Sequence, residues 1–565
     1  MRLDAIIVGG GHNGLTAAAY LARAGLKVQV LEARHVIGGA SVTEELFSGF
    51  RYSRCSYLLS LLRPSVMREL ELKKYGLEYY IREPWSSFTP LRDSSEYLLL
   101  GQNQDANKQQ IAKFSQRDAE RYSQYEEWLS HMVRALVLRI IAMIDSQVPL
   151  MDAPPIDLSA ISAGKFPGNV SSALKQASLP LKMLHRLGLS NMPEFYELLT
   201  APASKILSRW FESEPLLCTL ATDAVIGANI SPETPGSGYV LLHHVMGELD
   251  GAPPGGWAFV KGGMGAVSNS IADSARAHGA MIRTDARVSQ ILLEDADTVC
   301  GVELEGGEKI YAPVVLSNAT PKVTFLDLLP DGANLGHEFK QSIKGIDYSS
   351  ATTKINLALS QLPNFQCIPN VGRDPLPHHG TTIHLGASSM ADLHGSFKES
   401  IHTGSPSVDN PLMIEMTIPS AIDPTLAPTG CHVATLFIQW TPYKHFANIS
   451  ESGMTAFTDR VLETIEAYCP GFRKSVLHMD VLTPSRLEQE FGLTGGNIFH
   501  GSMSLDQLYW TRPTAFHGAN GRFAGGYRTP LKGYYLCGSG AHPGGGVMGS
   551  PGRICAKSVL ADQKV

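Results

Sequence analysis

The stretch IIVGGGHNGL, residues 6–15, decides the fold of the N-terminal part of the chain. The apolar run at 5–8 predicts a short β-strand, and GLTAAAYLARAGLKV, residues 14–28, predicts a helix after the glycines. A second strand, KVQVLEA at 27–33, follows. Strand, glycine turn, helix and strand together predict the βαβ unit that binds a dinucleotide in a doubly wound sheet.

The glycines of this turn fit the GxGxxG fingerprint at Gly9, Gly11 and Gly14. Gly9 allows the tight turn, Gly11 lets a pyrophosphate approach the backbone, and Gly14 lets helix and strand pack closely. The helix N-terminus stabilises the pyrophosphate through free N–H groups and the helix dipole. Glu32, which ends the second predicted strand, can accept hydrogen bonds from both hydroxyls of an adenosine ribose and repels a 2′-phosphate.

Composition narrows the class of protein. The 565 residues exceed the size of a single hydrophobic core, so we expect at least two domains. A 44% hydrophobic and 18% charged content is typical of a folded globular protein. The net charge of −6, without Lys/Arg blocks, argues against nucleic acid as a partner. The eight cysteines are scattered, without a CxxC pair or a metal-ligand spacing, so we expect neither dithiol chemistry nor a metal site.

No segment is expected to cross a membrane. The stretch MVRALVLRIIAMI, residues 132–144, is interrupted by Arg134 and Arg139, whereas a spanning helix needs roughly 20 consecutive apolar residues. The first strand is predicted so close to the N-terminus that we expect no signal or transit peptide.

The βαβ unit alone does not distinguish FAD from NAD, and three further segments favour FAD. They are ARHVIGGASVTEE (33–45), VKGGMGAVSNSIADSARAHGAMIRTDARVSQI (260–291) and YYLCGSGAHPGGGVMGSPGRICAKSVL (534–560). Together they resemble the cofactor-binding segments of the amine oxidase and phytoene desaturase-like group of FAD-dependent oxidoreductases. A second complete fingerprint is missing, so no separate NAD(P)H domain is expected.

This resemblance implies where FAD contacts the chain. The main chain at Val288 faces the adenine, and the N–H groups of Val547 and Met548, at a helix start, stabilise negative charge at the pyrimidine end of the reduced flavin. His12 is interpreted as a residue packed at the turn rather than as a catalyst. The predicted cofactor-binding residues are Gly9, Gly11, His12, Asn13, Gly14, Glu32, Ala33, Arg34, Gly38, Gly39, Ala40, Val288, Gly538, Gly546, Val547 and Met548.

The predicted fold class is α/β, with a discontinuous Rossmann-type FAD-binding domain of GR2-like type and an inserted α+β substrate domain. Residues 1–60, 250–325 and 525–565 are assigned to the FAD-binding domain, and residues 61–249 and 326–524 to the substrate or cap domain.

The predicted substrate domain begins with helical patterns and ends with strand patterns. Amphipathic helices are predicted at 118–144 and 171–189, either over the substrate side of the flavin, against an ordinary core or on a membrane surface. The basic residues that favour the membrane alternative are Arg134, Arg139, Lys175, Lys182 and Arg186. Strands that floor the substrate cavity are predicted at 349–360, 412–420 and 432–440.

The resemblance implies hydride transfer from a substrate C–H bond to flavin N5, with an apolar or lipid-like small molecule as substrate. Amine oxidation and C–C desaturation both stay open. Lys354 is a candidate for holding a water near N5 if it faces inward, although a solvent-facing lysine is the favoured interpretation. His542, in the flavin-side turn, and His243 and His244 are weaker candidates, each more typical of a structural histidine.

A second hypothesis, from a different class, is a flavin-bearing or Rab GDP-dissociation-inhibitor-like scaffold that binds or regulates without turnover. Glu32, the stretch RHVIGG at 34–39 and the C-terminal glycines within 534–560 favour FAD binding over a cofactor-free scaffold. The resemblance implies a location in the mitochondrial matrix and a link to mitochondrial function. The cytoplasm is the alternative, because no presequence is expected.

Overall fold

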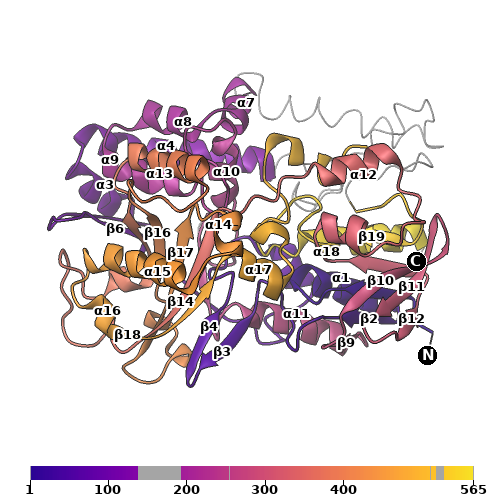
Figure 1. Ribbon diagram of the computed structural model, residues 1–565. Coiled ribbons are helices and arrows are strands. Elements are labelled where there is room, and N and C mark those ends of the chain that lie inside the picture. Colours follow the sequence, from indigo (N-terminus) through magenta and orange to yellow (C-terminus); the bar gives the residue numbers. More distant parts are fainter. Residues whose placement is uncertain (1, 138–191, 253–254, 509–510, 517–526, 564–565) are drawn as a thin grey trace.

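Two large β-sheets lie side by side in the computed structural model, each with its own helices (Figure 1). The structure describes residues 2–137, 192–252, 255–508, 511–516 and 527–563. Both chain ends lie beside the smaller, five-stranded sheet (Figure 1). The larger sheet has seven strands. The predicted α/β class, with a discontinuous Rossmann-type domain, is confirmed.

The five-stranded sheet is parallel throughout, in the order β19-β13-β1-β2-β9. Its strands are β1 (Ala5–Val8), β2 (Val28–Leu31), β9 (Met281–Arg283), β13 (Val314–Ser317) and β19 (Tyr534–Leu536). All four residues of β1 are buried, which matches the apolar run in the sequence. Because the carboxyl ends of parallel strands meet at one edge of a sheet, segments from the start, middle and end of the chain converge there.

Three helices pack around this sheet: α1 (His12–Arg23), α11 (Gly265–Ala277) and α18 (Ser550–Gln563). Helix α1 contacts both of the others. A Cβ atom added at Gly552 of α18 would lie 2.1 Å from the carbonyl oxygen of Asn13, so the close approach of α1 and α18 requires a glycine. The first helix is thereby fixed against the last one.

Smaller elements surround the parallel sheet. They are the pair β3 (Thr43–Phe47) and β4 (Phe50–Ser53), the pair β5 (Tyr79–Ile81) and β8 (Ala258–Val260), the sheet of β10 (Val288–Asp295), β11 (Thr298–Leu304) and β12 (Lys309–Tyr311), α2 (Pro64–Glu69), the π-helix η2 (Val323–Asp327) and α12 (His337–Lys344). One hydrophobic core joins the parallel sheet to apolar side chains from 59–77 and 325–346.

The seven-stranded sheet has the order β18-β14-β17-β16-β15-β6-β7, and only the β15–β6 pair is parallel. Its strands are β6 (Trp85–Pro90), β7 (Tyr97–Gly101), β14 (Thr352–Leu359), β15 (Thr382–Gly386), β16 (Met413–Thr417), β17 (His432–Gln439) and β18 (Val476–Leu482). Strands β14, β16 and β17 fall within the three predicted strand segments, and those predictions are confirmed.

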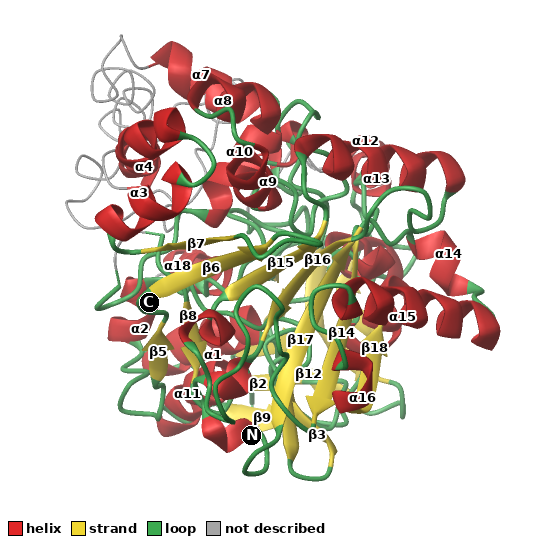
Figure 2. Cartoon of the chain, turned by 90° about the vertical axis from the view of Figure 1, so that its left-hand side faces the viewer, coloured by secondary structure: helices red, strands yellow, loops and turns green. Residues whose placement is uncertain are grey.

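Helices lie on both sides of this sheet (Figure 2). They are α3 (Gln104–Ala112), α4 (Gln116–Val137), α7 (Met192–Thr200), α8 (Ala203–Trp210), α9 (Glu214–Thr222), α10 (Ser237–His244), α13 (Met390–Thr403), α14 (Tyr443–Ala447), α15 (Glu451–Glu466), α16 (Phe472–Ser475) and α17 (Pro484–Phe491). This part of the chain also contains short 3-10 helices: η3 (Pro377–Gly380), η4 (Pro419–Ala421), η5 (Pro424–Leu426), η6 (Thr494–Gly496) and η7 (Leu505–Gln507).

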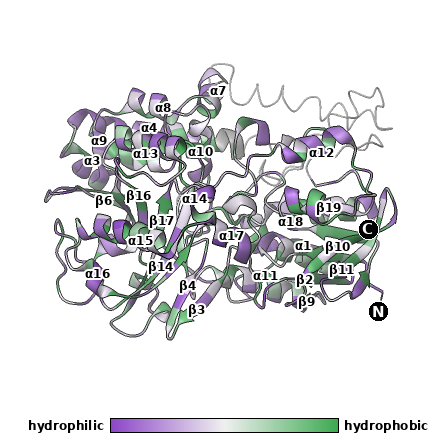
Figure 3. Cartoon of the chain, viewed as in Figure 1, coloured by the Kyte–Doolittle hydropathy of each residue, from purple (hydrophilic) through white to green (hydrophobic). Residues whose placement is uncertain are grey.

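The two faces of the seven-stranded sheet differ because side chains alternate along each strand. Ile355 and Ile438 belong to a core shared with α15. Phe437, on the opposite face, belongs to a core shared with α4, α9 and α10. Hydrophobic residues mark the strands of both sheets, whereas many outer helices are hydrophilic (Figure 3). The face that carries Phe437 forms part of the candidate active site described below.

Two helical predictions have different outcomes. The segment 118–144 is helical as far as Val137, in α4. The predicted helix at 171–189 lies outside the described residues, and so do Arg139, Lys175, Lys182, Arg186 and the side chain of Arg134. Within the described part of the chain, no helix combines the length and apolar character needed to span a membrane.

Candidate active site

The glycine turn brings three distant segments together. Gly9 adopts a left-handed conformation with φ 97°, and Gly11 caps α1 without a side-chain hydrogen bond. The N–H of Gly38 donates to the carbonyl of Gly10 at 2.8 Å, and Asn13 Nδ2 donates to Ser539 Oγ at 3.1 Å. The first N–H groups of α1 therefore lie where the predicted cofactor segments 9–14, 38–40 and 538–548 adjoin.

Asn318, at the carboxyl end of β13, is a site residue that the sequence interpretation missed. Its Nδ2 donates to the carbonyl of Gly9 at 3.2 Å. A Cβ added at Gly11 would lie 2.8 Å from the same Nδ2. A side chain at Gly11 would therefore press on the Asn318 amide and would also obstruct the predicted approach of a pyrophosphate. The available signal was a polar residue directly after a buried parallel strand.

Glu32 lies beside this turn at the carboxyl end of β2. Its side chain is buried, with 7% exposed, and its two oxygens accept from the N–H of Gly10 at 2.7 Å and of Arg34 at 2.9 Å. A carboxylate has acceptor capacity for further donors, such as the hydroxyls of a ribose. Ala33 and Arg287 line an adjoining cavity of about 380 Å³. Val288, the first residue of β10, directly follows Arg287 in the sequence.

Several predicted cofactor residues carry buried polar atoms that have no partner in the described structure. These atoms are Nε2 of His12, Oδ1 of Asn13 and Nη1 of Arg34. Buried polar atoms are normally hydrogen-bonded, so three unpartnered polar atoms on adjoining segments indicate that a polar ligand binds there. The residues present therefore fit FAD.

The flavin-side turn has unusual backbone geometry. Gly546 has φ 132°, and Val547 has φ 55°, which is strained for a β-branched residue. Helix α18 begins at Ser550, so Val547 and Met548 precede its first residue. The carbonyl of Met548 accepts from the N–H of Arg63 at 3.1 Å. Gly538 lies against Asn318, and an added Cβ would be 2.8 Å from the carbonyl oxygen there.

A main cavity of about 860 Å³ connects these segments with the seven-stranded sheet. Four predicted cofactor residues line it: His12, Ala40, Gly546 and Val547. Its opposite wall includes residues of α4, α9 and α10, and its floor is the Phe437 face of the sheet. The cavity thus joins the cofactor segments to the substrate sheet.

Lys354 on β14 points into this cavity, so the favoured interpretation of a solvent-facing lysine is wrong. Its side chain is 3% exposed. Its Nζ donates to the carbonyls of Ser53 and Cys55, both at 2.5 Å, and lies 4.9 Å from the ring centre of Tyr57. Burial lowers the pKa of Lys354 to about 7. Backbone acceptors in a distant loop make this burial tolerable, and the sequence gives no sign of them.

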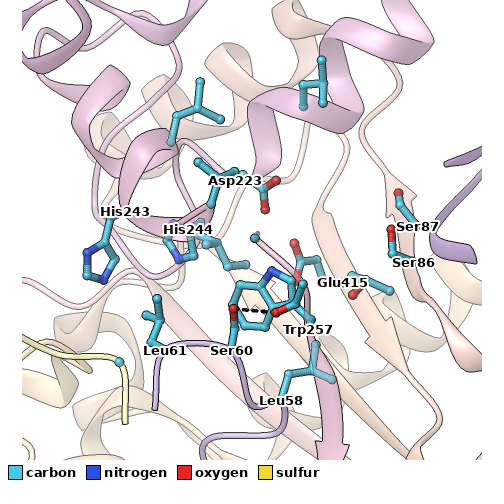
Figure 4. A pocket seen from close by; sticks show the side chains of 18 of the residues that line it. Leu58, Ser60, Leu61, Ser86, Ser87, Asp223, His243, His244, Trp257 and Glu415 are labelled. Carbon is cyan, nitrogen blue, oxygen red and sulfur yellow. Dashed lines mark hydrogen bonds between the residues drawn. The ribbon is translucent and has the colours of Figure 1, made fainter. Parts of the chain in front are cut away.

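A second group of ionisable side chains lies further along the cavity. Tyr57 donates its hydroxyl to Glu415 Oε2 at 3.1 Å, and Arg82 Nη1 donates to Thr382 Oγ1 at 2.6 Å. The carboxylates of Asp223 and Glu415 point toward the same part of the cavity (Figure 4). Burial, together with Asp223, raises the pKa of Glu415 to about 8, and burial raises that of Asp223 to about 6.

The sequence interpretation missed Arg82, Asp223 and Glu415. One signal was available, because Glu415 is the single charged residue in the apolar strand LMIEMTIPS. Nothing in the sequence indicated that Asp223, from the end of α9, lies opposite it.

The histidine candidates divide into two groups. His243 lines the cavity, and burial, together with the neighbouring His244, lowers its pKa to about 3. His244 also lines the cavity, with Nδ1 2.9 Å from the carbonyl of Val240. His542 is buried in the flavin-side turn, where its carbonyl accepts from the Tyr527 hydroxyl, and it is not among the residues that line the cavity.

Comparison with known proteins connects this geometry to a family. The model of NAD(P)-binding Rossmann-like domains matches residues 7–70, and the model of flavin-containing amine oxidoreductases matches residues 160–408. Cyclohexylamine oxidase from Brevibacterium oxydans has a similar fold, with a TM-score of 0.55 and 14% identity over 100% of both chains.

Two relatives match nearly the whole chain. A phytoene desaturase (lycopene-forming) from Pantoea ananas is 24% identical over 98% of this chain and 98% of its own. Pyridine nucleotide-disulfide oxidoreductase domain-containing protein 2 from Rattus norvegicus is 50% identical over 99% of this chain and 94% of its own. All eight cysteines lie in the described ranges and are free thiols, so the disulfide in that name has no counterpart here. The chain belongs to the family of pyridine nucleotide-disulfide oxidoreductase domain-containing protein 2, in the phytoene desaturase-like and amine oxidase group of oxidoreductases, whose cofactor is FAD.

Proposed function

We propose that the protein oxidises a largely apolar small molecule in the main cavity, by hydride transfer from a substrate C–H bond to flavin N5. The observation that carries this proposal is the continuity of the cavity. It runs from four predicted cofactor residues to the floor of the seven-stranded sheet. A molecule bound there lies against the cofactor segments at one end and against the sheet at the other.

The chain offers a partner for each part of FAD. The first N–H groups of α1 would hold the pyrophosphate, Glu32 the ribose and the main chain at Val288 the adenine. The N–H groups of Val547 and Met548 would face the pyrimidine end of the ring system. Bound FAD supplies the two-electron acceptor that no side chain can provide.

The protein's own residues position the substrate and handle the proton. Lys354, with a pKa of about 7, can hold or release a proton near neutral pH, and its neighbours Ser53 and Cys55 keep it at the cofactor end. Apolar lining residues exclude water from the same space; they include Leu58, Leu61, Leu100, Leu129, Trp257 and Phe437.

The apolar lining and the phytoene desaturase relative support an apolar substrate. We extend the proposal to contact with a membrane surface from which such a molecule is taken. We also propose a location in the mitochondrial matrix, on the resemblance noted from the sequence, with the cytoplasm as the alternative. Fractionation of cells that express the tagged full-length chain separates these two locations.

The test begins with purified protein, which should be yellow. Anaerobic incubation with hydrocarbon, isoprenoid and amine candidates should bleach the visible flavin absorbance for at least one class, and analysis of the product separates desaturation from amine oxidation. Protein that cannot be loaded with FAD contradicts the proposal. The scaffold alternative is favoured if no candidate substrate reduces the FAD-loaded protein and if no acceptor reoxidises its reduced form.

A further inference from the structure

Most of the surface of the main cavity is apolar. Lys354, Glu126 and Glu127 also line it, and three further charged residues form one group. We call Arg82, Asp223 and Glu415 the charged wall. Arg82 and Glu415 are each 6% exposed, so both ionisable groups are withdrawn from bulk water. Withdrawing charges from water costs free energy unless they are paired, so the charged wall calls for a specific reason.

The position of the charged wall relative to the cofactor end follows from strand register. Lys354 on β14 pairs with Phe437 on β17, and Phe437 pairs with Glu415 on β16. Directly paired residues project from the same face, and all three line the cavity. Two strand spacings separate the backbones of Lys354 and Glu415, which amounts to roughly 10 Å. The charged wall therefore lies well beyond the end where Lys354 contacts the loop at 53–55.

Within the described ranges, no Lys or Arg lies within ion-pair distance of Asp223 or Glu415, although Arg82 attracts both electrostatically. Arg82 donates to the neutral hydroxyl of Thr382, its Nε has no acceptor, and within the described ranges it makes no ion pair. Glu415 accepts from Tyr57, and its second oxygen is 4.0 Å from Nδ1 of His384. While Glu415 keeps its proton, the charges of Arg82 and Asp223 balance. Ionisation of Glu415 leaves one negative charge in excess, which a single cation would balance.

The direction in which Asp223 and Glu415 point indicates where such a cation would sit. Both carboxylates are directed to the same part of the cavity (Figure 4). An added ammonium group there would contact two acceptors, whereas an added carboxylate would meet two like charges. The apolar residues between this place and the cofactor end suit a hydrocarbon chain.

We propose that the charged wall binds a protonated amino group at the end of the substrate that lies away from the cofactor segments, roughly 10 Å across the sheet from Lys354. The substrate is then an amphipathic molecule whose amino group anchors it and is not itself oxidised. This inference rests on the proposed function, because it assigns a substrate class to the same cavity.

Binding of a cation has a proton signature. With a pKa of about 8, Glu415 retains a proton at neutral pH and releases it when an ammonium group arrives. A carboxylate ligand would instead require Asp223, with a pKa of about 6, to take up a proton. Besides Arg82 of the wall itself, the ionisable groups around Asp223 and Glu415 are Tyr57, Tyr122, Tyr125, His384 and His244. Burial lowers the pKa of His384 and of His244 to about 4, and that of Arg82 to about 10, so none of these changes charge near neutral pH.

The experiment is calorimetric titration of the FAD-loaded, full-length protein with octylammonium chloride, near neutral pH and in two buffers of different protonation enthalpy. Sodium octanoate and octan-1-ol are the matched probes. Octylammonium should bind at least tenfold more tightly than octanoate and release up to about one proton. Glu415→Gln should weaken octylammonium binding at least tenfold and abolish the proton release, and Asp223→Asn should weaken it as well. Ser86→Ala, at another lining position, should change neither.

Visible flavin absorbance and melting temperature show that each variant is folded and loaded, and Asp223→Asn replaces Glu415→Gln if the latter fails to fold. Tighter binding of octanoate with proton uptake would overturn the inference, as would unchanged octylammonium binding in both variants. Octylammonium binding that depends on Glu415, in a protein that no candidate substrate reduces, would leave the inference standing and refute the proposed function. Flavin reduction by a neutral hydrocarbon, unaffected by Glu415→Gln, would support the proposed function and refute the inference about the amino group.

Discussion

Lys354 and Glu415 are both register partners of Phe437, one on each side, so the two ionisable side chains share one face of the sheet two strands apart. Burial favours the neutral form of each: it lowers the pKa of Lys354 to about 7 and raises that of Glu415 to about 8. At neutral pH the cavity floor thus combines a lysine that is about half protonated, at the cofactor end, with a mostly protonated carboxylic acid further away. The titration of both groups should be detectable in how the free energy of unfolding depends on pH.

Replacing Lys354 by Met should change how stability depends on pH. The folded pKa of about 7 lies below the unfolded value of 10.5, so the unfolded chain binds more protons between these values. The free energy of unfolding of the wild type should therefore rise with pH from about 7 upward, relative to Lys354→Met, by up to ~1.4 kcal/mol per pH unit. Urea denaturation at several pH values measures this slope. The exposed Lys108→Met is the control, and an equal slope in wild type and Lys354→Met would contradict the prediction.

Glu415→Gln should act with the opposite sign. The folded pKa of about 8 exceeds the unfolded value of 4.5, so the folded protein holds the extra proton between these values. The contribution of Glu415 to stability is present below pH 4.5 and is lost as pH rises toward 8. Glu415→Gln should remove this decline and become progressively more stable than the wild type toward pH 8. A constant stability difference between the two proteins from pH 5 to 8 would refute it.

Substitution at Gly11 should separate packing from cofactor binding. Gly11→Trp should give colourless protein, because the side chain blocks the approach of a pyrophosphate. In Gly11→Ala the added Cβ meets Asn318 Nδ2 at 2.8 Å, so both melting temperature and FAD affinity should fall. Adding Asn318→Ala should restore the melting temperature but not the affinity. Thermal denaturation and FAD titration of the four proteins measure this, and full recovery of affinity would show that Gly11 serves Asn318 alone.

Glu32→Gln should weaken FAD binding. The neutral amide is a poorer acceptor for ribose hydroxyls and for the N–H groups of Gly10 and Arg34. An increase in the FAD dissociation constant of about tenfold is expected, equal to about 1.4 kcal/mol. Fluorescence titration of the apoprotein measures the constant. Glu45→Gln, at an exposed position nearby, should leave it unchanged.

Arg54→Met should destabilise the fold. Arg54, directly after β4, forms ion pairs with Glu44 of β3 at 3.1 Å, Asp480 of β18 at 3.0 Å and Glu490 of α17 at 2.7 Å. Its side chain is buried, and removal takes away three charge-assisted contacts, although Arg34 still pairs with Glu44 and Arg486 with Asp480 and Glu490, so a cost of about 1–3 kcal/mol is expected. Arg473→Met, which breaks the exposed pair with Asp459, should cost less than about 1 kcal/mol. Equal losses in chemical denaturation of the two variants would contradict this prediction.

Local patterns predicted much of the fold. The β1-α1-β2 unit follows from an apolar run, spaced glycines and a helix-forming stretch, all close in sequence. The strands β14, β16 and β17 follow from apolar and β-branched runs, and the discontinuous cofactor domain follows from the resemblance of three separate segments.

The long-range contacts of the site could not be predicted in this way. Lys354 is buried because carbonyls at 53 and 55 accept its hydrogen bonds, and this loop is distant in sequence. Asp223 and Glu415 face the same part of the cavity only because α9 shares a hydrophobic core with the seven-stranded sheet in the folded protein. Periodicity determines which face of an element is apolar, but the partner across a cavity depends on tertiary packing.

The hydrogen bond between Asn13 and Ser539, and the packing of α1 on α18, also have a consequence for biosynthesis. A nascent chain can form β1, the glycine turn and α1 early, yet Ser539 of the flavin-side turn is translated 526 residues after Asn13. The cofactor pocket is therefore completed only after the whole stretch between these residues has been made. Retention of FAD would report that both ends of this stretch have folded together.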